Sequence, residues 1–318
     1  MNAWIRTRLC IVFAWLPLIA VAEPFAYSVN SDQPLGDTLH LINLSDGSAT
    51  AWGVQLNSKG VPRRDVEGLA IAPDLALWGI DEEQKLLFQV DTVLGIVQDG
   101  TEVPVEGVGP DSGNDFGMTF ACNGELYISS VATQSLYTLD QTTGQATVVG
   151  AEGNLGVNIS AIAAFGNDPV QLFGLGNGYV GELGPVDNRS LYAIDPDTGV
   201  ASWIGMLGPG AADYTQAGLS FDANGTLWAI TDRAQFGQGS QILQIDTTTG
   251  VGTVISTTLG IGFESLAAAP PAGCEALPVE PLPDEITAPI PTIGIPGLLT
   301  AILLLLLGGA WQLRRARA

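Results

Sequence analysis

Apolar and polar residues alternate along short segments that recur at intervals of about 50 residues. In each copy an alternating segment ends in Asp or Asn, a few turn residues and Gly follow, and a second segment rich in Val, Thr and Ile comes next. Alternation with a period of two buries one face of a strand, Asp or Asn caps the start of a turn, and Gly provides the positive φ needed to leave it. The pattern predicts five β-hairpins, at residues 39–47, 87–95, 136–144, 191–199 and 242–250.

A second element precedes each of the last four hairpins. It is a short apolar run of small residues, which a turn connects to one more strand pattern; the runs lie at 67–73, 116–121, 160–164 and 217–222. Small apolar residues along a whole strand indicate packing on both of its faces. Each repeat therefore predicts four strands, and a four-stranded repeat of this length is typical of a β-propeller blade. Trp and Tyr residues at matching strand positions predict packing between blades rather than a carbohydrate platform.

The two ends of the repeat region complement each other. Residues 263–270 read as one more small-residue inner strand with no outer strands after it, whereas Phe25 to Trp52 supplies outer strands with no inner strand before them. Pairing these ends closes a ring and leaves few exposed edges. We therefore predict an all-β fold, a five-bladed β-propeller formed as a closed ring of four-stranded blades. The alternatives are a ring of four or six blades and a right-handed β-solenoid, whose coils are usually shorter.

Two apolar segments flank the repeats. Residues 1–22 combine Arg6 and Arg8, an apolar run and Ala20-Val21-Ala22, which predicts a signal peptide cleaved before Glu23. Residues 293–313 carry no charge and are long enough to cross a bilayer as one transmembrane helix, with basic residues following at 314–318. Basic residues stay cytoplasmic, so the chain between the segments faces outward. The predicted order is signal peptide, propeller (23–270), Pro-rich acidic stalk (271–292), membrane helix and basic cytoplasmic tail.

Charge changes the picture of possible partners. The chain carries 33 acidic and 11 basic residues, a net charge of −22, and every acid follows Ala22. Such a surface repels phosphate backbones, so we expect no nucleic-acid partner. It suits divalent cations, basic partners or a salty medium, and solubility alone also explains it.

The cysteines allow one disulfide in the exported part. Cys10 leaves with the signal peptide, which leaves Cys122 and Cys274. Both follow inner strands and exit on the same face of the predicted ring, so a bridge forms if the run after Ala269 folds over the channel. A buried free thiol at Cys122 is the alternative.

Catalytic patterns are absent from the sequence. His40 is the only histidine and is expected to face solvent on an outer strand, so nucleophilic triads and His/Cys metal sites are excluded. Carboxylates are the remaining chemistry: Asp65, Glu67, Asp115 and Glu264 fall at the starts of inner strands, which share one face of a propeller. Converging carboxylates could hold Ca²⁺ or could serve as the acid/base pair of a glycosidase. We expect no obligatory cofactor.

Two resemblances add to this reading. Ile290-Pro291-Thr292-Ile293, followed by an apolar helix and Arg314-Arg315, resembles the IPTL-CTERM sorting signals of Gram-negative bacteria. That resemblance implies processing by an exosortase-like enzyme, although Ile293 replaces the usual Leu and Pro296-Gly297 replaces the usual Trp-Gly pair. The ring is similar in architecture to repeat propellers of bacterial surface proteins, which include both binding scaffolds and enzymes.

The sequence thus predicts an exported protein of the cell envelope. The expected place is the inner membrane with the ectodomain in the periplasm, or transfer to the surface or secretion once the tail is processed. The expected role is a non-catalytic module that binds a surface protein, glycan or ion. The alternative is a secreted, glycosidase-like hydrolase that uses the carboxylates of the channel mouth.

Overall fold

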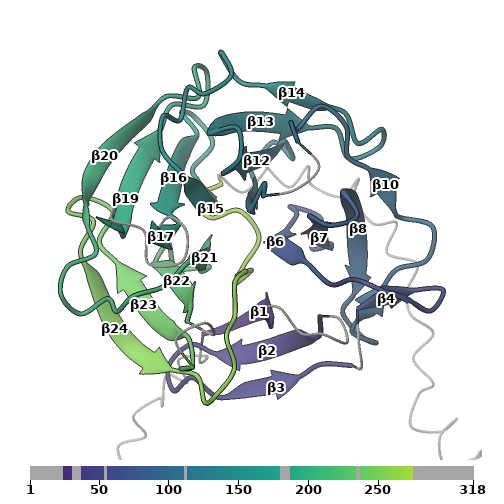
Figure 1. Cartoon of the computed structure of the whole chain (residues 1–318), viewed down its shortest axis with the longest axis horizontal. Coiled ribbons are helices and arrows are strands. Elements are labelled where there is room, and N and C mark those ends of the chain that lie inside the picture. The colour runs from purple at the N-terminus through teal and green to yellow at the C-terminus, as the bar shows by residue number, and fades with distance from the viewer. Residues whose placement is uncertain are drawn as a thin grey trace, which may run out of the picture. The chain divides into compact units, whose positions relative to one another are not determined.

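The computed structural model describes residues 24–30, 37–53, 56–110, 113–179, 187–233 and 237–274. These residues form an all-β fold, and none of them lies in a helix. Five sheets follow one another in a ring, as the predicted five-bladed propeller requires (Figure 1). Residues of the inner strands, 67–69, 117–118, 160–162 and 217–219, line a narrow channel at its centre. The repeat pattern in the sequence therefore identified the fold class and the number of blades.

The terminal segments are not part of this description. The predicted signal peptide, the membrane helix at 293–313, the basic tail and the sorting-motif residues Ile290, Pro291 and Thr292 all lie outside the described residues. Within the described residues, no helix is long and apolar enough to span a membrane.

In blades 3 to 5 each strand of the sheet pairs antiparallel with the next, and in blade 2 the two short outer strands both pair with the third strand. Blade 2 contains β6 (Val66–Ile71), β7 (Leu77–Asp81), β8 (Leu86–Asp91) and two short outer strands, β9 (Ile96–Val97) and β10 (Val103–Pro104). Blade 3 contains β11 (Phe116–Phe120), β12 (Leu126–Ser130), β13 (Ser135–Leu139) and β14 (Ala146–Val148). The first strand of each blade lines the channel, as the small-residue runs predict.

Blade 4 contains β15 (Ile159–Phe165), β16 (Gln171–Gly176), β19 (Ser190–Ile194) and β20 (Ala201–Met206). Blade 5 contains β21 (Gln216–Phe221), β22 (Leu227–Asp232), β23 (Gln241–Ile245) and β24 (Gly252–Thr257). Two small two-stranded sheets lie outside the five blades. They pair β4 (Asn57–Ser58) with β5 (Val61–Pro62), and β17 (Gly178–Tyr179) with β18 (Asp187–Asn188).

Both ends of the repeat region build blade 1. β1 (Phe25–Val29), β2 (Leu39–Asn43) and β3 (Ala49–Ala51) form its sheet, and residues 263–267 lie along β1 at the channel. Tyr27 and Ala267 exchange two backbone hydrogen bonds of 2.9 Å, and a further bridge joins Asn30 to Phe263. The predicted ring closure is therefore present, although the closing segment forms isolated bridges instead of a continuous strand.

The core consists of five apolar clusters, one at each interface between neighbouring blades. Blades 4 and 5, for example, share a cluster that contains Leu175, Leu207, Tyr214 and Leu243. Trp78, Tyr137 and Trp228 lie in these clusters, as predicted, whereas Trp203 on β20 is 63% exposed. The prediction was wrong for Trp203, which lies on the outermost strand of blade 4, and for Trp52, which is 36% exposed.

Each hairpin also fastens its blade to the previous one. The glycine that ends the hairpin turn lies against the backbone of the outer strand region of the preceding blade. A Cβ atom at Gly95 or Gly144 would lie 1.8 Å from the carbonyl oxygen of Trp52 or Pro104. The same contact recurs around the ring, with Gly47 on Thr257, Gly199 on Val149 and Gly250 on Gly205. Gly47 thereby joins the first hairpin to the last strand and closes the ring at its rim.

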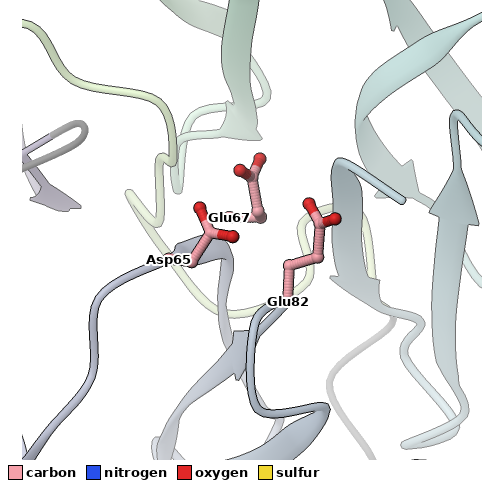
Figure 2. Close-up of side chains that lie close together, drawn as sticks. All are labelled: Asp65, Glu67 and Glu82. Carbon is pink, nitrogen blue, oxygen red and sulfur yellow. The ribbon is translucent and has the colours of Figure 1, made fainter. Parts of the chain in front are cut away.

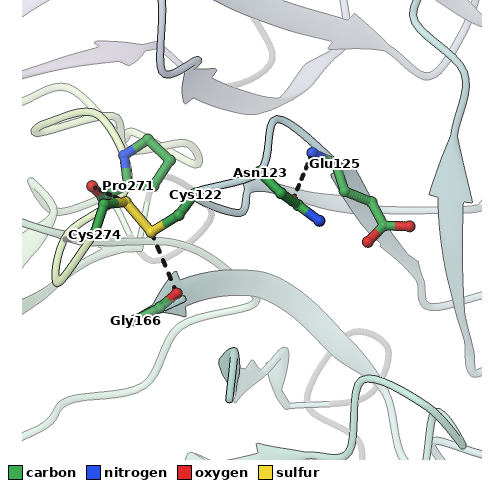
Figure 3. The surroundings of a disulfide bond; sticks show 6 residues. All are labelled: Cys122, Asn123, Glu125, Gly166, Pro271 and Cys274. Carbon is green, nitrogen blue, oxygen red and sulfur yellow. Dashed lines mark hydrogen bonds between the residues drawn. A yellow bond between two sulfur atoms is a disulfide. The ribbon is translucent and has the colours of Figure 1, made fainter. Parts of the chain in front are cut away.

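The chain that follows the closing segment crosses the exit end of the channel, where the inner strands end. Pro270, Pro271 and Ala272 line a cavity there together with the ends of the inner strands of blades 2 to 5. The amide of Gly166 donates a 2.8 Å hydrogen bond to the carbonyl of Ala272. A disulfide then joins Cys274 to Cys122, with the Cα atoms 5.5 Å apart (Figure 3). The packing of the ring thus continues to Cys274, a little beyond the boundary expected at residue 270.

Candidate ligand site at the acidic end of the channel

The opposite end of the channel, where the inner strands begin, is acidic. Val66 of β6 pairs with Asp81 of β7, so the start of one strand meets the end of the other. Asp65 precedes Val66 in the chain, Glu67 follows Val66, and Glu82 follows Asp81. One carboxylate oxygen from each of Asp65, Glu67 and Glu82 lies within 4.8 Å of the others (Figure 2). The antiparallel pairing of two neighbouring strands therefore brings these three carboxylates together.

Glu67 occupies an irregular position in β6. The register of β6 against β7 shifts between Val66 and Gly68, so Glu67 is the extra residue of a β-bulge. Its side chain is only 5% exposed, and it lines the channel interior beside small residues of the other blades. A bulge re-aims a side chain that regular alternation would direct elsewhere.

Electrostatics single out Glu67 within the cluster. Burial raises its pKa well above the usual value, and the charges of Glu264, Asp115, Asp65 and Glu82 raise the pKa further, in that order. The predicted candidates Asp65, Asp115 and Glu264 thus act on Glu67 from three blades, with Glu264 supplied by the closing segment. Every charged group that shifts the pKa of Glu67 is itself an acid.

Glu82 is a member of the cluster that the sequence reasoning missed. Its carboxylate accepts hydrogen bonds from the backbone amides of Asn114, at 2.8 Å, and Asp115, at 3.1 Å. It therefore ties blade 2 to the start of the inner strand of blade 3. The signal that could have identified it is its place one residue after a second strand, at the turn where antiparallel pairing returns the chain to the acidic end.

Neutral polar groups complete this end of the channel. The Gln216 side chain donates a 3.3 Å hydrogen bond from Nε2 to Oε1 of Glu67. Asn114 is fully buried and accepts a hydrogen bond from Ser130, and Asn158 accepts one from Gln134. The site therefore offers oxygen atoms of carboxylates and amides, the donor type that hard cations prefer.

His40 contributes nothing to this site and does not face solvent as predicted. It is 7% exposed on β2, and its ring packs edge-on against Phe263 with the centroids 5.1 Å apart. Burial lowers its pKa, and a backbone contact with Thr38 opposes that shift. The prediction was wrong because the closing segment, which includes Phe263, covers a face of blade 1 that its own three strands would leave open.

The fold and the site define a five-bladed β-propeller whose channel is acidic at one end and covered by its own chain at the other. No protein-family description matches the chain, and no curated protein matches it. Among solved structures it is similar to virginiamycin B lyase from Staphylococcus aureus, with 19% identity over 74% of this chain and 71% of that one and a TM-score of 0.41.

Two further similarities are of the same order. A gluconolactonase from Xanthomonas campestris is 14% identical over 75% of this chain and 78% of its own, with a TM-score of 0.43. A protein of unknown function from Bacteroides caccae is 10% identical over 77% of this chain and 98% of its own, with a TM-score of 0.47. Similarity at this level assigns no activity to the chain.

Proposed function

We propose that this protein is an exported, envelope-anchored β-propeller that acts as a non-catalytic binding module, with its ligand site at the acidic end of the channel. One observation carries the proposal: carboxylates from three blades surround the buried Glu67 without a basic group among the charges that act on it. Buried like charges are costly unless a positive partner or a proton offsets them. The site therefore fits a positively charged ligand.

Hydrolysis of glycosides fits this geometry less well. Retaining glycosidases hold their two carboxyl groups about 5–5.5 Å apart and inverting ones about 6.5–9.5 Å apart, on either side of a sugar. Here the oxygens of Asp65, Glu67 and Glu82 lie within 4.8 Å of one another, and both glutamates are 5% exposed. The nearest oxygens of these three acids are therefore closer together than the carboxyl groups of either class of glycosidase. The glycosidase-like alternative is tested by the assay of chromogenic glycosides described below.

Anchoring in the envelope rests on the sequence. The signal-peptide pattern, the apolar segment at 293–313 and the final arginines support an ectodomain outside the inner membrane, and the IPTL-CTERM-like motif supports an exosortase-like partner. Mass spectrometry of the mature N-terminus should find Glu23 first. A reporter fused after Ala318 that is active only in an exported compartment should stay inactive.

The binding role is tested with purified full-length protein in a non-ionic detergent. The variants compared are Asp65→Asn/Glu67→Gln, which removes two of the three acids of the cluster, and Glu152→Gln, which removes an exposed acid elsewhere. Divalent chlorides, an oligolysine peptide and neutral glycans are screened for a shift in thermal unfolding, and chromogenic glycosides for turnover. We expect a shift with a cationic ligand that only the cluster variant loses. Glycoside turnover that the cluster variant loses would replace this proposal with the hydrolase.

A further inference from the structure

Blade 4 places a second side chain where blade 2 places Glu67. The register of β15 against β16 shifts between Ile159 and Ala161, so Ser160 is the bulged residue of its inner strand, as Glu67 is in β6. Ser160 is 3% exposed and lines the same channel cavity as Glu67. Two bulges at matching positions thus turn a hydroxyl and a carboxylate into the channel at the same level.

The hydroxyl of Ser160 has no hydrogen-bond partner within the part of the chain that the structure describes. The same holds for Oε1 of Gln216, a buried atom of the amide whose other end contacts Glu67. A buried polar atom left unpaired costs about 1–3 kcal/mol. Two such oxygens beside a carboxylate cluster therefore point to a bound group that accepts oxygen ligands.

The surroundings of these atoms restrict what that group is. Pro270, Pro271 and Ala272 lie at the exit end of the channel, and the carboxylates lie at the opposite end. The narrow interior is formed by residues as small as Gly68, Gly117 and Gly218. An ion fits such a space, whereas a side chain of a partner protein would have to enter between closely packed strands.

We propose that the acidic end of the channel binds one Ca²⁺ ion, with the carboxylates of Asp65, Glu67 and Glu82 and the oxygens of Ser160 and Gln216 as candidate ligands. This inference rests on the proposed function and names the chemical class of its ligand. Ca²⁺ takes six to eight oxygen ligands in flexible geometry, which suits oxygens supplied by three blades. Mg²⁺ demands near-ideal octahedral geometry and keeps its waters, and Zn²⁺ selects His and Cys, which this cluster lacks.

The ion also changes the mechanics of the ring. Glu67 belongs to blade 2, Ser160 to blade 4 and Gln216 to blade 5, so a shared ion links the inner strand of blade 2 to those of blades 4 and 5. Anything that binds only the folded state raises the unfolding temperature in proportion to the logarithm of its concentration. Ca²⁺ should therefore raise the unfolding temperature more than Mg²⁺ at equal concentration.

The test is isothermal titration of full-length protein in detergent with CaCl₂ and, separately, MgCl₂, at 150 mM NaCl to screen diffuse binding to the acidic surface. We expect one Ca²⁺ per chain with a Kd of about 10⁻⁵–10⁻³ M, and Mg²⁺ weaker by about tenfold or more. Glu67→Gln should weaken Ca²⁺ binding by about tenfold or more, and Ser160→Ala by several-fold. Glu152→Gln should bind as the wild type does.

Folding of the variants is read from thermal unfolding in EDTA. Glu67→Gln is nearly isosteric and removes a buried charge, so it should unfold at or above the wild-type temperature in EDTA while losing the shift that Ca²⁺ produces. No saturable Ca²⁺ binding by the wild type, or equal losses for Glu67→Gln and Glu152→Gln, would overturn the Ca²⁺ assignment. The proposed function would stand if another cationic ligand still raised the unfolding temperature of the wild type but not of Asp65→Asn/Glu67→Gln. It would fail if no cationic ligand did so, or if the protein turned over a glycoside.

Discussion

The two ends of the channel are built from the same inner strands and held together by opposite means. At the exit end, apolar strand ends, a proline-containing segment and a disulfide bring the chain together. At the acidic end, the charges of Glu264 and Asp115 act unfavourably on the buried carboxylate of Glu67. A ring that is fastened covalently at one end can therefore hold mutually unfavourable charges at the other. Four predictions probe this division.

The largest effect is expected where the closing segment meets blade 5, midway between the two ends. A Cβ atom on Gly218 would lie 2.3 Å from the carbonyl carbon of Ser265 and 2.4 Å from the amide nitrogen of Leu266. Gly218→Val should displace the closing segment and destabilise both ends, by more than about 4 kcal/mol or to the point of misfolding. Urea unfolding measures the loss. Gly210→Ala is the control, because its nearest contact would be 3.9 Å away; similar losses for the two would disprove the explanation.

Breaking the disulfide removes the covalent fastening of the exit end. The bridge closes a loop with a sequence separation of 152 residues, and its loss should cost about 2–4 kcal/mol of unfolding free energy. Cys122→Ser/Cys274→Ser should lower the urea midpoint, and dithiothreitol should lower that of the wild type to a similar value. A thiol count on denatured, unreduced protein should give no free thiol from these two residues.

The acidic end should show itself in the pH dependence of stability. The pKa of Glu67 is raised in the folded state, above its ordinary value of 4.5, by burial and by its acidic neighbours. Its contribution is therefore fully present below pH 4.5 and is lost as the pH rises through the folded pKa. In EDTA the wild type should lose stability relative to Glu67→Gln as the pH rises from 4 to 8. Parallel curves for the two proteins would contradict the prediction, and CaCl₂ should reduce the difference.

Ser160→Ala should have the smallest effect on stability. It removes a buried hydroxyl that has no partner among the described residues, so in EDTA the unfolding free energy should stay within about 0.5 kcal/mol of the wild type or rise slightly. The same variant should lose part of its Ca²⁺ affinity. A clear loss of stability in EDTA would mean that the hydroxyl supports the fold rather than a ligand.

Hairpins and small-residue runs made most of the fold predictable. The turn that starts at Asp140 shows why: its carboxylate accepts hydrogen bonds of 2.8 Å from the amides of Thr142 and Thr143, a local interaction that sequence spacing reveals. These backbone amides also lower the pKa of Asp140. The blade count followed because five such local signals had to close one ring.

Long-range contacts were less predictable. The register shifts that re-aim Glu67 and Ser160 depend on how each inner strand meets its neighbour, and residue spacing carries no sign of them. Glu82 was missed because reasoning from inner strands ignored the second strands that end at the same face. His40 was misplaced because Phe263, which covers it, is distant in sequence.

The glycine contacts at the rim have a consequence for the evolution of this ring. Each repeat carries both parts of the contact between blades: a hairpin glycine that lies against the previous blade, and an outer strand region against which the next hairpin glycine lies. In blade 3, Gly144 lies against Pro104 of blade 2, and Val149 is contacted by Gly199 of blade 4. A gene duplication of one repeat length, begun at any point, inserts one complete pair of these parts and leaves every existing contact intact. Insertion of one whole repeat thus preserves the pairing of hairpin glycines with outer strands, whereas insertion of half a repeat leaves one of the two without its counterpart.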